Sequence, residues 1–370
     1  MISDVRACDI SNLNEGDPMP ETTIQTFSVR RLEIMAADGT ADEALLPDLS
    51  GDQLRRLHYL MLLTRTFDRR ALALQREGRI GTYPSVLGQE AAQVGSAFAL
   101  QQSDWVFPSF REMGAHLTLG YPVHQLFQYW GGDERGLRTP DGMNLFPICV
   151  SVGTHIPHAA GAALAARARG DRSAVAAYFG DGATSKGDFH EGFNLAGALK
   201  LPVVFICQNN QWAISVPLAA QTAAPTLAQK ALAYGFEGIQ VDGNDVLAVF
   251  RATGEALVRA RDGGGPTFIE CLTYRMADHT TADDASRYRP PADVEAWRDR
   301  DPLLRFERFL AKRGLWNGDY GAEVQAKAEG EIDEAVRRYE SVPPPEPGEM
   351  FAFTCAELSP RQRRQQENIR

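Results

Sequence analysis

The centre of the chain alternates short apolar runs with longer helical patterns. Four apolar runs, separated or flanked by amphipathic stretches such as 188–199 and 245–261, lie at residues 173–179, 203–207, 238–241 and 267–273. Short runs without polar alternation are typical of strands buried on both faces of a parallel sheet. The alternation of such strands with helices predicts an α/β fold: a doubly wound parallel sheet of about six strands with helices on both faces.

The segments on either side of this centre divide the chain into three expected parts. These are an N-terminal arm (1–48), the α/β domain (49–315) and a C-terminal helical tail (316–370). Within the arm, residues 26–40 alternate and then turn at Asp38-Gly39, which suggests a small hairpin. Ser50 precedes a helical apolar pattern and is the expected N-cap of the first long helix.

Charge and composition exclude several classes of partner. The formal net charge is -10 and the pI is about 5.3, so the field of the protein repels nucleic acids and anionic lipid, and neither is an expected partner. The sequence has no apolar run of membrane-spanning length and no start typical of a signal peptide. The five cysteines form no CxxC pair and no zinc pattern, which fits a cytoplasmic location, and Cys207 and Cys271 are expected in the core.

Two of the predicted strands end in polar loops. Gly180-Asp181-Gly182 follows one apolar run, and Asn209-Asn210 follows the next. In a parallel βαβ unit both loops leave the sheet at its carboxyl edge, where ligands bind in such folds. Asp181 offers a carboxylate oxygen and Asn210 an amide oxygen, which suit Mg²⁺ together with phosphate oxygens. The glycines allow the backbone to approach a phosphate closely.

A nicotinamide-binding site is the alternative use of a sheet of this kind. It requires the spacing Gly-x-Gly-x-x-Gly. After Gly182 the next glycine is Gly187, which is too far along the chain. A nicotinamide-binding dehydrogenase is therefore a remote alternative.

The two loops are part of a longer pattern. It resembles the alpha subunit of the thiamine-diphosphate-dependent decarboxylase component of 2-oxoacid dehydrogenase complexes, the pyruvate and branched-chain 2-oxoacid dehydrogenase family, from about Leu49 to Leu315. The resemblance is carried by the segments GQEAA (88–92), GDGATSKGDF (180–189), NNQWAIS (209–215), VDGND (241–245), TYR (273–275) and HTTADD (279–284). A lone Gly-Asp-Gly would be a weak signal, whereas the set of segments is specific.

The resemblance implies a cofactor site. Asp181, Asn210 and the carbonyl of Trp212 would hold Mg²⁺. The implied thiamine diphosphate-binding residues are Phe110, Arg111, Val150, Val152, Asp181, Gly182, Ala183, Gln208, Asn210, Ala213 and His279. Among them, Arg111 would pair with phosphate oxygens, Val152 would support the bent form of the cofactor, and His279 would be the catalytic residue on a flexible loop.

The resemblance also implies an activity and partners. The expected reaction is oxidative decarboxylation of pyruvate with transfer of the acyl group to a lipoyl group. The alternative substrate is 3-methyl-2-oxobutanoate, a branched-chain 2-oxoacid, and an acetoin dehydrogenase is a remote alternative. In this family the glutamate that contacts the pyrimidine ring lies on a beta subunit. We therefore expect two alpha and two beta chains, no activity without the beta subunit, and a lipoyl acyltransferase core as a further partner.

Several other positions have simpler interpretations. Glu90 is expected to place favourable charge at a helix start rather than to serve the pyrimidine ring. Ser151 and Thr154 match a potassium site of branched-chain relatives, but His155 departs from that pattern and is expected to pack or cap. Thr280 stands where animal relatives carry a regulatory serine. A scaffold that has lost the chemistry is disfavoured, because the residues of the implied site are intact.

Overall fold

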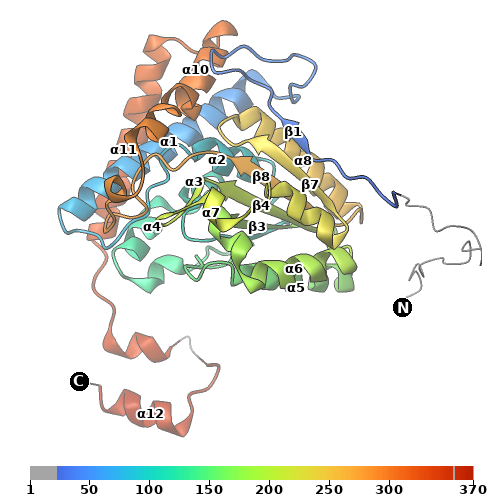
Figure 1. The fold of residues 1–370 in the computed structure, drawn as a ribbon. Coiled ribbons are helices and arrows are strands. Elements are labelled where there is room, and N and C mark those ends of the chain that lie inside the picture. Colours follow the sequence, from blue (N-terminus) through green and yellow to red (C-terminus); the bar gives the residue numbers. More distant parts are fainter. Residues whose placement is uncertain (1–22, 353–354, 370) are drawn as a thin grey trace, which may run out of the picture.

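The computed structural model describes residues 23–352 and 355–369 and contains one six-stranded sheet (Figure 1). All neighbouring strands are parallel, in the order β1-β7-β8-β4-β3-β2. The strands are β1 (Arg30–Leu32), β2 (Trp105–Phe107), β3 (Val175–Gly180), β4 (Val203–Asn209), β7 (Glu237–Asp242) and β8 (Thr267–Leu272). This confirms the predicted doubly wound α/β fold.

Helices cover both faces of the sheet. One side carries α1 (Gly51–Arg76), α2 (Glu90–Phe98), α8 (Val246–Arg261), α10 (Pro302–Lys312) and α11 (Gly318–Glu340), and the other carries α5 (His155–Arg169), α6 (Gly187–Ala198) and the 3-10 helix η3 (Ala228–Tyr234). Alternate residues of β4 enter different cores: Val204 and Ile206 face the first layer, whereas Val203 and Phe205 face the second. The strands read as continuous apolar runs because both of their faces are buried.

Smaller elements complete the fold. They are α3 (Met113–Thr118), α4 (Val123–Trp130), α7 (Leu218–Gln221), α9 (Pro291–Glu295), α12 (Pro360–Glu367), the hairpin strands β5 (Trp212–Ala213) and β6 (Val216–Pro217), and the 3-10 helices η1 (Glu134–Leu137), η2 (Asp181–Ser185), η4 (Ala285–Arg287), η5 (Arg298–Arg300) and η6 (Pro347–Phe351). None of the helices in the described part of the chain is both long and apolar enough to cross a membrane.

The first long helix begins where the sequence predicts. Ser50 is the N-cap of α1, and it forms a capping box with Gln53. The Gln53 backbone N–H donates to Ser50 Oγ (3.3 Å), and the Ser50 N–H donates to Gln53 Oε1 (2.9 Å). Two otherwise unpaired backbone donors at the helix start are thereby satisfied.

Two strands differ from the sequence prediction. The prediction of a hairpin at 26–40 is wrong for residues Arg30–Leu32, because they pair in parallel with β7. Within the described part of this region, the antiparallel pairing is limited to an isolated bridge between Met35 and Ala41. Strand β2 was not predicted. It has three residues, too few to show a periodicity, and it forms because β3 offers a free edge for pairing.

The C-terminal helices lie on and beyond the body of the fold. Helix α11 packs against α1 and α4, whereas α12 lies away from the body (Figure 1). The expected N-terminal arm (1–48) includes residues 1–22, which are outside the described residues. The division of the chain at 48/49 and 315/316 stays a prediction.

Candidate active site

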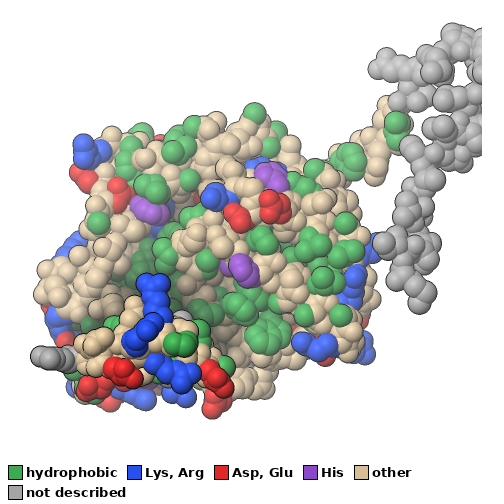
Figure 2. All heavy atoms as spheres, turned by 90° about the horizontal axis from the view of Figure 1, so that it is seen from below, with side chains coloured by type: hydrophobic (Ala, Val, Ile, Leu, Met, Phe, Trp, Pro, Cys, Tyr) green, Lys and Arg blue, Asp and Glu red, His purple; other side chains and the backbone are tan. Residues whose placement is uncertain are grey.

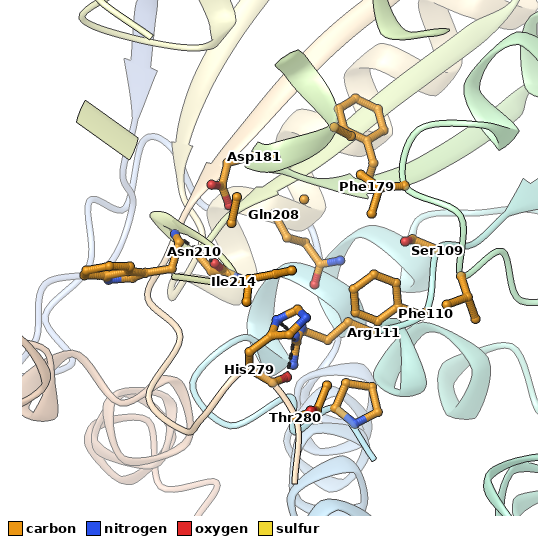
Figure 3. A pocket seen from close by; sticks show the side chains of 18 of the residues that line it. Ser109, Phe110, Arg111, Phe179, Asp181, Gln208, Asn210, Ile214, His279 and Thr280 are labelled. Atoms are coloured by element: carbon orange, nitrogen blue, oxygen red, sulfur yellow. Dashed lines mark hydrogen bonds between the residues drawn. The ribbon is translucent and has the colours of Figure 1, made fainter. Parts of the chain in front are cut away.

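A cavity of about 560 Å³ opens at the carboxyl ends of β3 and β4 (Figure 3). All residues that the sequence predicts for the cofactor and metal site line it: Phe110, Arg111, Val150, Val152, Asp181, Gly182, Ala183, Gln208, Asn210, Trp212, Ala213 and His279. Two neighbouring parallel strands therefore bring both polar loops to one sheet edge, where folds of this class bind ligands.

Asp181 is a buried carboxylate directly after β3. Its Oδ2 accepts a hydrogen bond from Gln221 Nε2 (2.7 Å), and in the described part of the chain it forms no ion pair. Burial raises the pKa of Asp181, against the opposing effects of Gln221, Arg275 and the backbone of Asn210. A buried carboxylate without a charged partner is stabilised by a nearby cation, which suits a metal ligand.

Asn210 lies at the end of β4. Its Oδ1 accepts from the Trp212 backbone N–H (3.2 Å), and its Nδ2 donates to Gln89 Oε1 (3.1 Å). The chain then turns sharply, since Gln211 and Ile214 have φ of 70° and 55°. This turn brings the Trp212 backbone back toward Asn210.

The oxygen atoms at this edge fit a hard divalent ion. Asp181, Asn210 and Trp212, which line the cavity together, offer a carboxylate, an amide oxygen and a backbone carbonyl. The described residues contain no group of three or more His, Cys, Asp or Glu side chains that could hold a metal alone. Mg²⁺ suits such a site because it binds few protein carboxylates and completes its shell with phosphate oxygens and water.

Arg111 and His279 contact each other on the side of the cavity away from Asp181 (Figure 3). Arg111 Nη2 lies 3.1 Å from His279 Nδ1 and donates to the His279 carbonyl (2.9 Å), while Nη1 donates to the Ser85 carbonyl (2.5 Å). Burial, and next the charges of Arg111 and Arg275, lower the pKa of His279 to about 4. Since a guanidinium only donates, Nδ1 must accept and the neutral ring carries its proton on Nε2.

The loop that carries His279 is tied to the body of the fold. The His279 N–H donates to Asp283 Oδ2 (2.9 Å), and the Thr281 N–H donates to the Tyr83 carbonyl (3.0 Å). The Tyr83 N–H donates in return to Thr281 Oγ1 (3.0 Å). Phe110 packs edge-on against the His279 ring, with a centroid distance of 6.0 Å. These contacts place the loop over the cavity.

Gln208 is held in a buried hydrogen-bond network. Its Oε1 accepts from Gln93 Nε2 (2.8 Å), and its Nε2 donates to Glu112 Oε1 (2.6 Å). Glu112 Oε2 also accepts from the Arg111 backbone N–H (3.1 Å). Burial raises the pKa of Glu112 to about 7, so this carboxyl group titrates near neutral pH.

Sequence reasoning missed part of the cavity wall. The additional lining residues include Thr82, Pro84, Gln89, Ser109, Glu112, Trp130, Phe179, Ile214 and Thr280. Gln89 lies inside the GQEAA segment and Glu112 follows the aromatic-Arg pair, so both were next to recognised signals. Thr280 was considered only as a regulated position. Ile214 lies inside the NNQWAIS segment, Phe179 lies in a predicted strand, and Trp130 is the last residue of α4. Thr82, Pro84 and Ser109 lie outside helices and strands, where no pattern marks them.

Three simpler predictions can be compared with the structure. Glu90 is the first residue of α2, as expected, and its carboxylate forms a buried ion pair with Arg65 (2.5 Å). Among the described residues, those that line the cavity do not include Glu90. His155 is buried and hydrogen-bonds the Tyr178 carbonyl (2.6 Å), which fits its expected packing role. Ser151 Oγ and Thr154 Oγ1, of the two residues that match a potassium site of branched-chain relatives, lie 3.0 Å apart.

The cavity mouth carries exposed apolar side chains. Val150, Val152 and Ile214 line the cavity yet are 57%, 41% and 56% exposed, and Val216 is 43% exposed. On the face shown in Figure 2, hydrophobic side chains form extended patches between scattered charged groups. Contiguous apolar surface beside a cavity typically marks a protein–protein interface.

Known proteins resemble this chain over most of its length. The family model described as "Dehydrogenase E1 component" matches residues 58–348. The chain is 41% identical to 3-methyl-2-oxobutanoate dehydrogenase subunit alpha of Mycobacterium tuberculosis over 360 residues, which is 97% of this chain and 98% of the relative. It is 44% identical to pyruvate dehydrogenase E1 component subunit alpha of Bacillus subtilis over 303 residues, 82% of each chain. The Staphylococcus aureus protein of the same name is 44% identical over 308 residues, 83% of each chain.

Proposed function

This chain belongs to the dehydrogenase E1 component family as the alpha subunit of a 2-oxoacid dehydrogenase, and we propose that its cavity binds thiamine diphosphate and Mg²⁺ for the decarboxylation of pyruvate. The observation that carries the proposal is the convergence of Asp181 and Asn210 from adjacent strand ends in one cavity. When bound, the cofactor supplies a nucleophilic carbon for the ketone and an electron sink for the loss of carbon dioxide.

Each side of the cavity has a distinct task in this proposal. Asp181, Asn210 and the Trp212 carbonyl hold the metal, and the metal holds the diphosphate. Because Gly182 has no side chain, its backbone can approach a phosphate closely. There is little room for a side chain at this position, since an added Cβ would lie 2.9 Å from the Ala213 Cβ. Arg111 contributes positive charge toward the phosphates.

His279 acts as a neutral hydrogen-bond donor in this proposal. Its ring accepts from Arg111 through Nδ1, so the Nε2 proton is available to the reacting groups. Its lowered pKa keeps the ring uncharged at neutral pH. The loop that carries it covers the cavity and excludes water from it.

The active enzyme requires a beta subunit. The name alpha subunit that the relatives carry implies such a partner, and the exposed Val150, Val152 and Ile214 provide apolar surface for it. We propose two alpha and two beta chains, with the pyrimidine glutamate supplied by the beta subunit. The acyl group would pass to a lipoyl group on an acyltransferase core: the lipoyl disulfide is reduced as one sulfur takes the acyl group and the other a proton. The cytoplasm is the proposed location.

Two substrates are supported by different observations. Pyruvate is favoured by relatives that are 44% identical over the shared domain. A second candidate, 3-methyl-2-oxobutanoate, is favoured by the relative whose match extends over 97% of the chain, including the terminal segments. The cavity walls contain both bulky and small apolar side chains. We propose that the beta subunit supplies further walls of the substrate pocket and so contributes to the choice.

The test is reconstitution with the beta subunit. The two chains are co-expressed, and carbon dioxide release and reduction of an artificial electron acceptor are measured with pyruvate, 3-methyl-2-oxobutanoate and acetoin. We expect the highest kcat/KM with pyruvate, and only when both subunits, thiamine diphosphate and Mg²⁺ are present. A higher kcat/KM with the branched substrate would move the assignment to the second candidate. Activity without thiamine diphosphate would overturn the proposal.

The metal assignment has its own test. Asp181→Ala is expected to abolish Mg²⁺-dependent binding of thiamine diphosphate in the reconstituted enzyme, measured by calorimetry, because it removes the carboxylate ligand. The matched control is Asp171→Ala, which removes an exposed carboxylate on the surface. Unchanged binding in Asp181→Ala would exclude Asp181 as a metal ligand.

A further inference from the structure

Gln89 is a fully buried glutamine between the metal-binding edge and the cavity. It precedes the first residue of α2, and it lines the same cavity as Asp181 and Asn210. Gly88, with φ of 88°, makes the turn that directs Gln89 into this position. Its own backbone is fixed by hydrogen bonds to the Val86 carbonyl and from the Gln93 N–H.

The hydrogen bonds around Asn210 fix which way each amide points. A backbone N–H can only donate, so the contact with Trp212 requires the oxygen of the Asn210 amide. The Asn210 nitrogen must then face Gln89, and the atom that meets it must be the Gln89 oxygen. The Gln89 nitrogen is consequently the atom that is left over.

The left-over nitrogen has no partner. Gln89 Nε2 is buried and, among residues 23–352 and 355–369, nothing accepts its hydrogens. A buried donor that makes no hydrogen bond is energetically unfavourable and is rare in folded proteins. A donor left in this state beside a cavity is suited to a ligand acceptor.

We propose, on the basis of the proposed function, that Gln89 has two linked roles toward the cofactor. Its Oε1 orients the Asn210 amide so that the oxygen of Asn210 is presented to the metal, and its Nε2 donates to a phosphate oxygen of thiamine diphosphate. Gln89 is a positioning residue for the metal and a direct ligand of the diphosphate. Only a side chain with one acceptor and one donor can perform both roles from this position.

A second glutamine shows why the assignment is specific to Gln89. Gln221 contacts the other metal ligand, since its Nε2 donates to Asp181 Oδ2. Its left-over atom in the described structure is Oε1, an acceptor. An acceptor cannot bind a phosphate oxygen at neutral pH, so Gln221 supports Asp181 without contacting the diphosphate.

The test uses two substitutions that separate the roles. Gln89→Met keeps the size of the side chain but removes both polar atoms. Gln89→Glu keeps an acceptor for Asn210, removes the donor and adds negative charge beside the diphosphate. Each variant is co-expressed with the beta subunit. The dissociation constant of thiamine diphosphate is measured at saturating Mg²⁺ by calorimetry, and the Mg²⁺ requirement is titrated at saturating cofactor.

We expect Gln89→Met to weaken cofactor binding by about ten- to a hundredfold and to raise the Mg²⁺ requirement. Gln89→Glu should weaken cofactor binding at least as much. Binding by Gln89→Met within twofold of wild type would overturn the proposal. Wild-type binding by Gln89→Glu would overturn the donation to phosphate, because that variant lacks the donor.

Controls separate this proposal from the proposed function. Gln325→Met removes an exposed glutamine amide on α11 and should bind the cofactor as wild type does. Thermal unfolding without cofactor reports whether each variant is folded, and the nearly isosteric Gln89→Glu provides a test if Gln89→Met is unstable. If the wild-type complex does not bind thiamine diphosphate, the proposed function fails. If the wild-type complex binds thiamine diphosphate and both Gln89 variants bind it with the affinity of wild type, only the inference about Gln89 fails.

Discussion

At the scale of single residues, burial shifts the pKa values of two side chains of the cavity so that their uncharged forms are favoured. The pKa of His279 is lowered to about 4 and that of Glu112 is raised to about 7. In both cases removal of the side chain from water disfavours its charged form. In the proposed function, the charge for binding the diphosphate is therefore left to Arg111 and the proposed Mg²⁺. His279 is suited to donate a hydrogen bond rather than to supply a positive charge.

Arg111→Lys should remove hydrogen bonds that hold the His279 loop against the cavity wall. A lysine cannot contact the Ser85 carbonyl and both His279 acceptors with one planar group, so the loop loses its anchor. We expect thiamine diphosphate affinity to fall by about tenfold or more, a loss typical of one charge-assisted hydrogen bond. Limited proteolysis should also cleave the loop at 279–284 faster. The matched control Arg172→Lys changes an arginine whose side chain is 84% exposed. Equal cleavage rates in both variants would argue against the anchor.

Glu112→Gln should change how stability depends on pH. Because the folded pKa of Glu112 is raised to about 7, the native state holds a proton that the unfolded state releases at lower pH. The stabilising contribution of the protonated group is therefore complete below the unfolded pKa and is lost as pH rises through about 7. Glutamine does not titrate, so this pH dependence should be absent from the variant, and the stability of the variant relative to wild type should rise by about 1 to 3 kcal/mol between pH 5 and 8. The variant also has a cost that does not depend on pH, because its amide nitrogen cannot accept the hydrogen bond that one carboxylate oxygen accepts.

Urea unfolding of both proteins at several pH values measures this difference. A constant offset between wild type and Glu112→Gln across the range would show that Glu112 does not titrate there. Both proteins are measured without cofactor, so that the difference reports the folded chain alone.

At the scale of elements, the buried strands were the most predictable part. The β3 and β4 runs are apolar on both faces, and this feature depends only on local sequence. Strands β1 and β2 have three residues each, and their pairing depends on a free edge that no local pattern reveals. Periodicity therefore predicted the centre of the sheet and failed at its two edges.

Two glycine substitutions test the packing of individual elements. Gly182→Ala would place a Cβ 2.9 Å from the Ala213 Cβ, so η2 and β5 must move apart at the cavity. We expect weaker cofactor binding by about tenfold, as is typical when an active-site backbone is displaced. Gly161→Ala on α5 meets nothing within 4 Å in the described structure and should stabilise the fold by about 0.5 to 1 kcal/mol. Calorimetry and thermal unfolding of both variants check these opposite outcomes. Unaltered cofactor binding in Gly182→Ala would show that this backbone is not in contact with the phosphates.

At the scale of the whole molecule, the site was predictable only where a motif marks it. Asp181 and Asn210 follow apolar runs at a recognisable spacing, so their convergence follows from parallel strand order. Gln89 and Glu112 were not identified, because their partners lie 121 and 96 residues away in sequence. Contacts of this kind depend on how the helices pack over the sheet, which the local sequence does not encode.

The exposed apolar surface beside the cavity is the second feature at the scale of the whole molecule. Val216→Asp should weaken assembly with the beta subunit, because it places a charge on apolar surface that the partner is proposed to cover. Val258→Asp is the matched control, since Val258 is 55% exposed on α8, which contributes no described residue to the cavity. Size-exclusion chromatography with light scattering distinguishes free chains from the complex. Equal assembly by both variants would place the interface elsewhere.

The three residues of β1 have a consequence for how the protein behaves when shortened. They occupy the hydrogen-bonding groups along the outer side of β7. A chain that began after Leu32 would present that side of the sheet uncovered, and an uncovered strand is a template for pairing with another molecule. Removal of the chain up to Leu32 by proteolysis would thus leave a subunit that is prone to form fibrils or precipitates, although no residue that lines the cavity would be lost.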